Sequence, residues 1–120
     1  MKTYFELMVE MGTSELSELE SRISVIMQHM LKIDHCPHLL MYNQRIWNGT
    51  IKRERGKILE LLDRRKPGVK SQLTQELVSK HYKDAFAKVT KEFPKQVFPR
   101  ICPYNVEQVV GNEVFALLKR

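Results

Sequence analysis

Cysteine, glycine and long apolar runs are scarce in this sequence. Its 120 residues include two cysteines, five glycines and five prolines. The two cysteines could in principle pair, but a reducing compartment favours free thiols. No uncharged run reaches the ~18 residues that a membrane span needs. The opening residues MKTYFE reach a glutamate without the apolar core of a secretory signal. We therefore expect a cytoplasmic protein with free thiols at Cys36 and Cys102 and no membrane segment.

Charge is unevenly distributed along the chain, whose formal net charge is +6. Residues 1–20 hold five glutamates against one lysine, whereas residues 45–70 hold nine basic side chains against three acidic ones. An apolar content of 42% is enough for one core, and the chain is too short for two ordinary domains. We predict one basic domain over residues 1–120, in which the 45–70 segment suits a partner of negative charge.

Apolar spacing predicts helices over most of the chain. In three segments, apolar residues recur at intervals of mostly three and four, as they do on one face of a helix. The stripes are Leu16, Leu19, Ile23, Ile26, Met30 and Ile33; then Trp47, Ile51, Ile58, Leu61 and Leu62; then Leu73, Leu77, Tyr82, Ala85, Phe86, Val89 and Phe93. Residues 4–11 and 106–110 predict two further, short helices.

Turn and capping residues indicate where these helices start and stop. We expect Ser14 or Ser17 to cap the first long helix and Asn105 to cap the last short one, because a side-chain oxygen accepts from the free amides of a first turn. The prolines at positions 37, 67 and 94 should end the three long helices. Further prolines at 99 and 103 predict an ordered connector after the third helix.

Three amphipathic helices with short connections favour an all-α fold, a small antiparallel helical bundle with short terminal helices. No stripe lasts beyond about three heptads, which argues against a coiled coil. No useful β alternation is present in the sequence. The residues that we predict to lie inside the bundle are Ile23, Ile26, Met30, Trp47, Ile51, Ile58, Leu77, Phe86 and Val89.

The segment HMLKIDHCPH, residues 29–38, concentrates side chains that can bind metals. Helical ligands usually lie four residues apart, but the residue four after His29 is an isoleucine. His35, Cys36 and His38 are too closely spaced for a zinc motif, and Pro37 interrupts them. We expect no metal and no cofactor. His29 should lie at the border of its stripe with one ring nitrogen hydrogen-bonded, and His35 and His38 at a helix end and loop.

Several short motifs occur in a recognisable order. They are Ser21-Arg22-Ile23, His29-Met30-Leu31-Lys32, Pro37, Trp47, Thr50-Ile51, Glu54-Arg55, Phe98-Pro99, Cys102-Pro103-Tyr104 and Glu107-Gln108. Taken together over residues 4–110, they make the chain similar to the bacterial family catalogued as Domain of Unknown Function 29. This resemblance implies a small all-helical protein and no established activity.

Some features depart from that family's pattern. Its members usually begin with a further long helix before the position of Tyr4, which we do not find here, so either the reading frame starts late or the fold is trimmed. A trimmed bundle would leave an apolar groove exposed. Ile33 stands where a tryptophan is often found, and the loop between Pro37 and Trp47 looks longer than usual. Within residues 29–38, His29 and Pro37 match family positions, whereas the other two histidines and the cysteine do not. That difference argues further against a metal site.

His29, Trp47, Glu54 and Arg55 form a candidate polar cluster if the first two long helices pack antiparallel. In a structural interpretation, Trp47 fills the core and Arg55 pairs with a carboxylate, since a buried charge needs a partner. In a catalytic interpretation, His29 is a general base and Arg55 clamps an anion, as in phosphoester hydrolysis. The structural interpretation is favoured, and no catalytic residue is assigned, because the sequence lacks a glycine-rich phosphate loop and any Ser-His-Asp order.

Two functions without catalysis remain. A nucleic-acid-binding protein would contact phosphates through Lys52, Arg53, Lys57 and Arg64 on the solvent side of their helix, although no helix-turn-helix or RNA-binding signature accompanies them. A protein-interaction module would bind a partner helix, or a second copy of itself, through unburied apolar surface. We predict this module, with nucleic-acid binding as the alternative and hydrolysis third.

Overall fold

The computed structural model describes residues 13–63 and 72–118, and this part of the chain is helical and contains no strand. Its elements are α2 (Thr13–His35), the 3-10 helix η1 (Pro37–Leu39), α3 (Leu40–Asp63), α5 (Gln75–Glu92), α6 (Val106–Val110) and α7 (Asn112–Leu118). The all-α prediction is therefore confirmed. The helix predicted at 4–11, and the stop predicted at position 67, lie outside the described residues.

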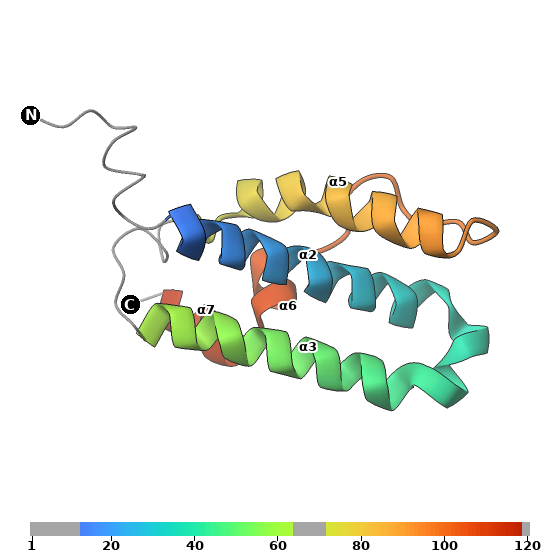
Figure 1. Ribbon diagram of the computed structural model, residues 1–120, viewed down its shortest axis with the longest axis horizontal. Helices are drawn as coiled ribbons and strands as arrows, with labels where there is room; N and C mark the ends of the chain where they lie inside the picture. The colour runs from blue at the N-terminus through green and yellow to red at the C-terminus, as the bar shows by residue number, and fades with distance from the viewer. Residues whose placement is uncertain (1–12, 64–71, 119–120) are drawn as a thin grey trace, which may run out of the picture.

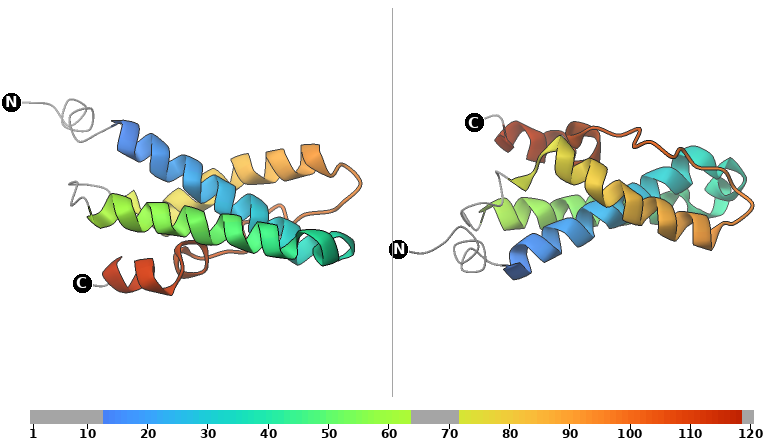
Figure 2. Two further views of the ribbon diagram at one scale, coloured as in Figure 1. Left: turned by 60° about the horizontal axis from the view of Figure 1, so that its bottom comes forward. Right: turned by 90° about the horizontal axis from the view of Figure 1, so that it is seen from above.

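The three long helices run up, down and up, with α2 in contact with both of the others (Figure 1). Helix α3 returns antiparallel to α2 after the short turn at η1, and α5 runs alongside α2 in the same direction. The two short helices, α6 and α7, lie on the other side of α3 and α2 from the viewer of Figure 1, as the rotated views in Figure 2 show. The body is elongated, with extents of 55 × 25 × 21 Å.

The core follows the apolar stripes. Six of the predicted core residues are buried, namely Ile23, Ile26, Trp47, Ile51, Ile58 and Val89. The other three, Met30, Leu77 and Phe86, are partly buried and pack against the core from its edge. The core also takes in Val109, Val110 and Val114 from the two short helices. Burying each large side chain contributes ~1.5–3 kcal/mol, so these short helices add substantially to the stability of the bundle.

The ends of the helices test the capping predictions. Helix α2 begins at Thr13, so Ser14 and Ser17 lie within the helix and the prediction that either caps it is wrong. The helix ends at His35, two residues before Pro37, as predicted. Helix α5 is capped by Thr74, whose hydroxyl accepts from the amide of Leu77, and it ends shortly before the proline at position 94.

The short helix α6 has the bounds and the cap that the sequence predicted. Asn105 accepts from the amide of Gln108, and the Gln108 side chain accepts from the amide of Asn105, which completes a capping box. Gly111 ends α6 at a φ of 87°, a conformation that glycine adopts with little strain. Helix α7 follows directly, and the sequence analysis did not predict it.

Helix α3 starts earlier than its apolar stripe. The residues expected to form a long loop before Trp47 are instead the first turns of α3, which begins at Leu40. Met41, Tyr42 and Ile46 are 85%, 78% and 66% exposed, and Leu40 is the one apolar residue of these turns that packs against the core, which is too little for a recognisable stripe. The loop prediction is wrong for this reason.

Candidate functional site

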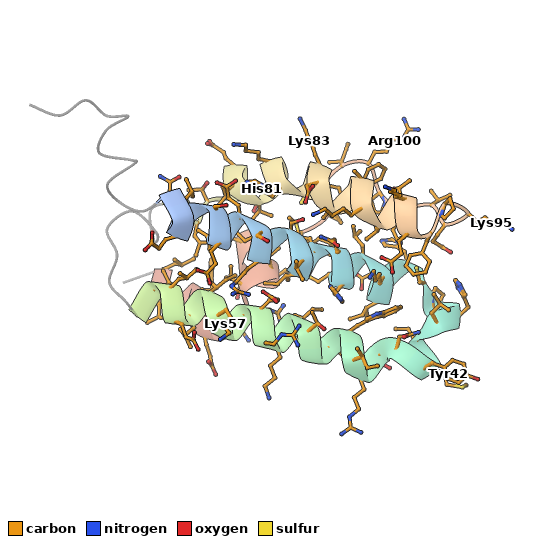
Figure 3. All side chains as sticks on the ribbon, in the orientation of Figure 1. Tyr42, Lys57, His81, Lys83, Lys95 and Arg100 are labelled. Atoms are coloured by element: carbon orange, nitrogen blue, oxygen red, sulfur yellow. The ribbon has the colours of Figure 1, made fainter. Side chains whose placement is uncertain are left out.

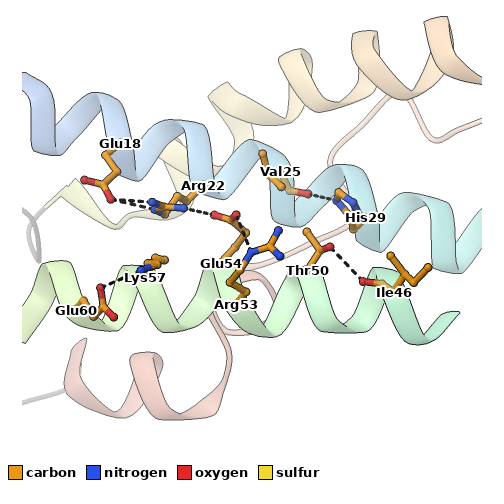
Figure 4. Close-up of polar contacts among 10 residues, drawn as sticks. All are labelled: Glu18, Arg22, Val25, His29, Ile46, Thr50, Arg53, Glu54, Lys57 and Glu60. Atoms are coloured by element: carbon orange, nitrogen blue, oxygen red, sulfur yellow. Dashed lines mark hydrogen bonds and ion pairs between the residues drawn. The ribbon is translucent and has the colours of Figure 1, made fainter. Parts of the chain in front are cut away.

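A charged network joins α2 to α3 at the predicted polar cluster (Figure 4). Arg22 Nη1 lies 2.6 Å from Glu54 Oε2, and Arg22 Nη2 lies 3.0 Å from Glu18 Oε1. Glu54 is buried, and the hydrogen bond from Arg22 satisfies its carboxylate. Hydrogen bonding to Glu54 raises the pKa of Arg22 against the opposing effect of burial, and Glu18 adds to the rise. The cation that balances Glu54 is therefore Arg22.

Trp47 packs beside a second buried charge. Lys32 is only 7% exposed, and its Nζ lies 5.9 Å from the ring centroid of Trp47 and 5.9 Å from that of Phe93. The same ammonium group forms a 2.9 Å ion pair with Glu92 at the end of α5. Aromatic faces attract a cation and a carboxylate neutralises it, so the buried charge of Lys32 is compensated. Lys32 and Trp47 thus tie the three long helices together.

His29 is half-buried on α2 and matches the structural interpretation. Its Nδ1 donates to the carbonyl of Val25 at 2.8 Å. Burial lowers the pKa of His29, although the hydrogen bond to Val25 opposes this effect. A half-buried ring with one nitrogen hydrogen-bonded within its own helix is what the sequence predicted at this border of the apolar stripe.

Arg55 does not pair with a carboxylate as the structural interpretation expected. Its Nε donates to the carbonyl of Val109 at 3.0 Å and its Nη2 to the carbonyl of Gln108 at 2.6 Å. Both acceptors lie in α6, so Arg55 fastens α6 to α3. Burial lowers the pKa of Arg55. A guanidinium can satisfy itself with backbone carbonyls, and the sequence alone does not reveal which helix supplies them.

The predicted cluster therefore divides between two places. Glu54 and Trp47 face the core side of α3 toward α2, whereas Arg55 turns toward α6. Arg22, which the sequence analysis did not include, is the residue that completes the Glu54 pair. Its position four residues after Glu18 was the available signal, because oppositely charged residues at that spacing meet on one helix face.

The side chains of residues 29–38 that could bind a metal have different surroundings. His35 packs edge-on against Phe98 at a centroid distance of 6.0 Å, Cys36 is buried, and His38 is exposed in η1. Burial raises the pKa of the Cys36 thiol. Cys36 and Cys102 are both free, as predicted. Within residues 13–63 and 72–118, no group of three or more histidine, cysteine, aspartate or glutamate side chains is placed to hold a metal ion.

Three of the four candidate nucleic-acid contacts lie on the solvent side of α3. Lys52, Arg53 and Lys57 are exposed, and Arg64 lies outside the described residues. Lys57 forms a 3.6 Å ion pair with Glu60, and Arg53 Nε lies 4.0 Å from Glu54. An exposed pair such as Lys57–Glu60 holds its side chains weakly, and the Arg53 side chain is 65% exposed, so both cations are accessible to a partner.

The outward side of α3 carries a second regular pattern, which the sequence analysis missed. Six exposed residues at intervals of four and three form one stripe opposite the buried face, and we call them the outer stripe: Tyr42, Ile46, Gly49, Arg53, Gly56 and Glu60. Figure 3 shows Tyr42 projecting away from the bundle at the start of α3. A Cβ built on Gly49 or Gly56 meets nothing within 4 Å. Their seven-residue separation was a visible signal in the sequence.

A groove of 660 Å³ lies between α2, α3 and the corner where α6 meets α7. Its apolar lining is Met30, Ile33, Ile51, Leu59, Val110 and Val114. Lys52, Arg55 and Gly56 line it from α3, and Asp34 and Glu113 line it from α2 and α7. The groove is separate from His29, which is not among its lining residues, so the geometry does not bring His29 and Arg55 together around one cavity.

These features define a small all-α protein built on a three-helix bundle. None of the helices in its described part has the length and hydrophobicity required to cross a membrane. Residues 3–115 match the family described as Domain of unknown function DUF29. The chain belongs to this family, which confirms the resemblance seen in its motifs. No curated protein and no solved structure matches the chain.

Proposed function

We propose that this protein is a non-catalytic helical protein-interaction module, and that its outer stripe on α3 binds a helix of a partner protein. The observation that supports this most directly is the exposure of Tyr42 and Ile46 in register with Gly49 and Gly56 on one helix face. A second helix could bury its own apolar side chains against Tyr42 and Ile46. The glycines would let the backbone of that helix approach α3 closely.

The two glycines carry a cost that the isolated chain does not recover. Glycine in an exposed helix interior is destabilising by roughly 0.5–1 kcal/mol relative to alanine. Neither Gly49 nor Gly56 has a positive φ, and no neighbouring atom lies near the position of a Cβ. The fold therefore gives no local reason for glycine at these positions, whereas close contact with a partner helix gives one.

The charges beside the outer stripe favour an acidic partner. Arg45, Lys52, Arg53 and Lys57 are exposed on this side of α3, with Glu60 as the carboxylate within the stripe. Two copies of α3 packed face to face would bring like charges together, which disfavours self-association through this surface. An amphipathic helix with aspartate or glutamate along its flanks complements it.

Nucleic acid is the alternative partner, since Lys52, Arg53 and Lys57 are also placed to meet phosphates. Exposed Met41, Tyr42 and Ile46 in the first turns of the same helix favour a protein instead, because nonspecific phosphate binding needs no apolar anchors. We propose further that the protein acts in the bacterial cytoplasm, where a reducing environment keeps Cys36 and Cys102 as thiols.

Capture of partners from a bacterial lysate, with and without nuclease, tests this function. We expect Ile46→Gln to lose about tenfold or more in affinity for a captured protein, as truncating an anchor does. The matched control is Val97→Gln, because Val97 is 84% exposed but lies in the connector before α6. Binding that is equal in the two variants would contradict the proposal.

The same capture distinguishes the alternatives. Nuclease-sensitive RNA or DNA that is lost after replacing Lys52, Arg53 and Lys57 with glutamate would establish nucleic acid as the partner. Its affinity would also fall steeply with salt, because each phosphate contact releases counterions. Light scattering of the purified protein tests self-association, and a dimer that Ile46→Gln dissociates would replace the heterologous partner with a second copy.

A further inference from the structure

We propose that the groove between α2, α3 and the α6–α7 corner binds a small amphipathic monoanion, a carboxylate carried on an aliphatic chain. The groove adjoins the outer stripe at Gly56, which belongs to both, but it takes a small molecule and not a partner helix. Small-molecule sites are typically concave, mostly apolar, ~300–1,000 Å³ in volume, and equipped with a few polar groups that orient the ligand. The groove, at 660 Å³, has these properties.

The apolar part of the groove supplies a place for the aliphatic chain. Met30 and Ile33 come from α2, Leu59 from α3, and Val110 and Val114 from α6 and α7. Met30, Ile33 and Leu59 pack only partly against the core, so part of their apolar surface stays available. Covering it with a methylene chain removes apolar area from water, which is favourable.

The cationic wall of the groove supplies a place for the carboxylate. Lys52 and Arg55 are three residues apart on α3 and both line the groove. Arg55 donates through Nε and Nη2 to two carbonyls, and these use only part of the donor capacity of a guanidinium. Among the described residues, its hydrogen-bond acceptors include no carboxylate. Burial lowers the pKa of Arg55, and an anion from outside would offset that effect.

The acidic residues of the groove set the orientation of the ligand. Asp34 lines it from α2 and already accepts a 2.7 Å hydrogen bond from the hydroxyl of Tyr104. Glu113 lines it from α7 and is exposed. Both repel a carboxylate, so the head group lies against the α3 wall and the chain extends toward α2 and α7. The same repulsion disfavours ligands with several negative charges.

An NMR titration of the full-length protein with octanoate, monitored through the backbone amide chemical shifts, tests this site. We expect roughly millimolar or tighter affinity, with shifts at Gly56 and Gly111, which line the groove, and none at Gly49, which does not. 1-Octanol, which lacks the charge, and octylammonium, which reverses it, should bind at least about fivefold more weakly. Inorganic phosphate should leave the three glycines unshifted.

Three variants, one of them a control, test the location without disturbing the fold. A Cβ at Gly56 meets no atom within 4 Å, so Gly56→Met should not disturb the fold. Its side chain would occupy part of the groove, and we expect octanoate affinity to fall about tenfold. Gly49→Met is the matched control on the same helix and should bind as the wild type does. Lys52→Gln should weaken binding about twofold to fivefold, and more at low salt. Arg55 is left unchanged because it also anchors α6.

Several results would overturn the proposal. They are equal affinity for 1-octanol and octanoate, wild-type affinity in Gly56→Met, equal loss in Gly49→Met, or no octanoate binding below several millimolar. Shifts caused by phosphate alone would mean that the groove binds a point charge without using its apolar surface. Weakened binding in Gly56→Met and Lys52→Gln, with Gly49→Met unaffected, would support it.

Discussion

Replacement of Glu54 by leucine tests whether the polar network between α2 and α3 is structural. The change leaves Arg22 facing an apolar neighbour, with only Glu18 at 3.0 Å as its remaining carboxylate. Breaking a fully buried pair costs about 3–5 kcal/mol. Arg22 is 25% exposed and keeps Glu18, so we expect a smaller loss of about 2–3 kcal/mol in the free energy of unfolding. Urea denaturation measures it as a fall of about 1 M in midpoint.

Two controls separate this ion pair from general damage to the core. Glu18→Ala removes the more exposed partner of Arg22 and should cost less than about 1 kcal/mol. The double replacement of Arg22 by methionine and Glu54 by leucine removes both charges, and stability should return to within about 1 kcal/mol of the wild type. A loss below about 0.5 kcal/mol in Glu54→Leu alone, or a double variant less stable than either single one, would refute the reasoning.

Three further predictions concern stability. Gly49→Ala and Gly56→Ala should each raise the free energy of unfolding by roughly 0.5–1 kcal/mol in urea, because a Cβ meets nothing at either position. Gly111→Ala should lower it by over about 1 kcal/mol, since φ is 87° and the new Cβ would lie 3.0 Å from Arg55 Cδ. Burial lowers the pKa of His29, so the unfolded chain binds its proton more readily; stability should fall as pH drops below about 6.5, and His29→Gln should lessen that fall in urea titrations.

The long helices could be predicted because their buried faces repeat in the sequence. Ile23, Ile26 and Val89 lie in stripes of regular spacing, and all three are buried. The start of α3 could not be predicted in this way, since Met41 and Tyr42 face solvent and contribute nothing to an inward stripe.

The partners of the polar side chains were beyond sequence reasoning for a different reason. Glu54 meets Arg22 across 32 positions, and Arg55 meets α6 across more than 50. These pairings depend on how far one helix is shifted along another, which apolar spacing does not determine. Sequence proximity therefore puts Glu54 and Arg55 in one cluster, although adjacent positions on a helix point about 100° apart.

Photocrosslinking in bacterial cells asks directly whether the outer stripe of α3 binds a partner protein. A benzophenone amino acid replaces Ile46 in the stripe, and in a control variant it replaces Ala87, which is exposed on α5. We predict a defined protein adduct at position 46 that resists nuclease and is absent at position 87. Identical adducts at both positions, or an adduct at 46 that consists of nucleic acid, would contradict it.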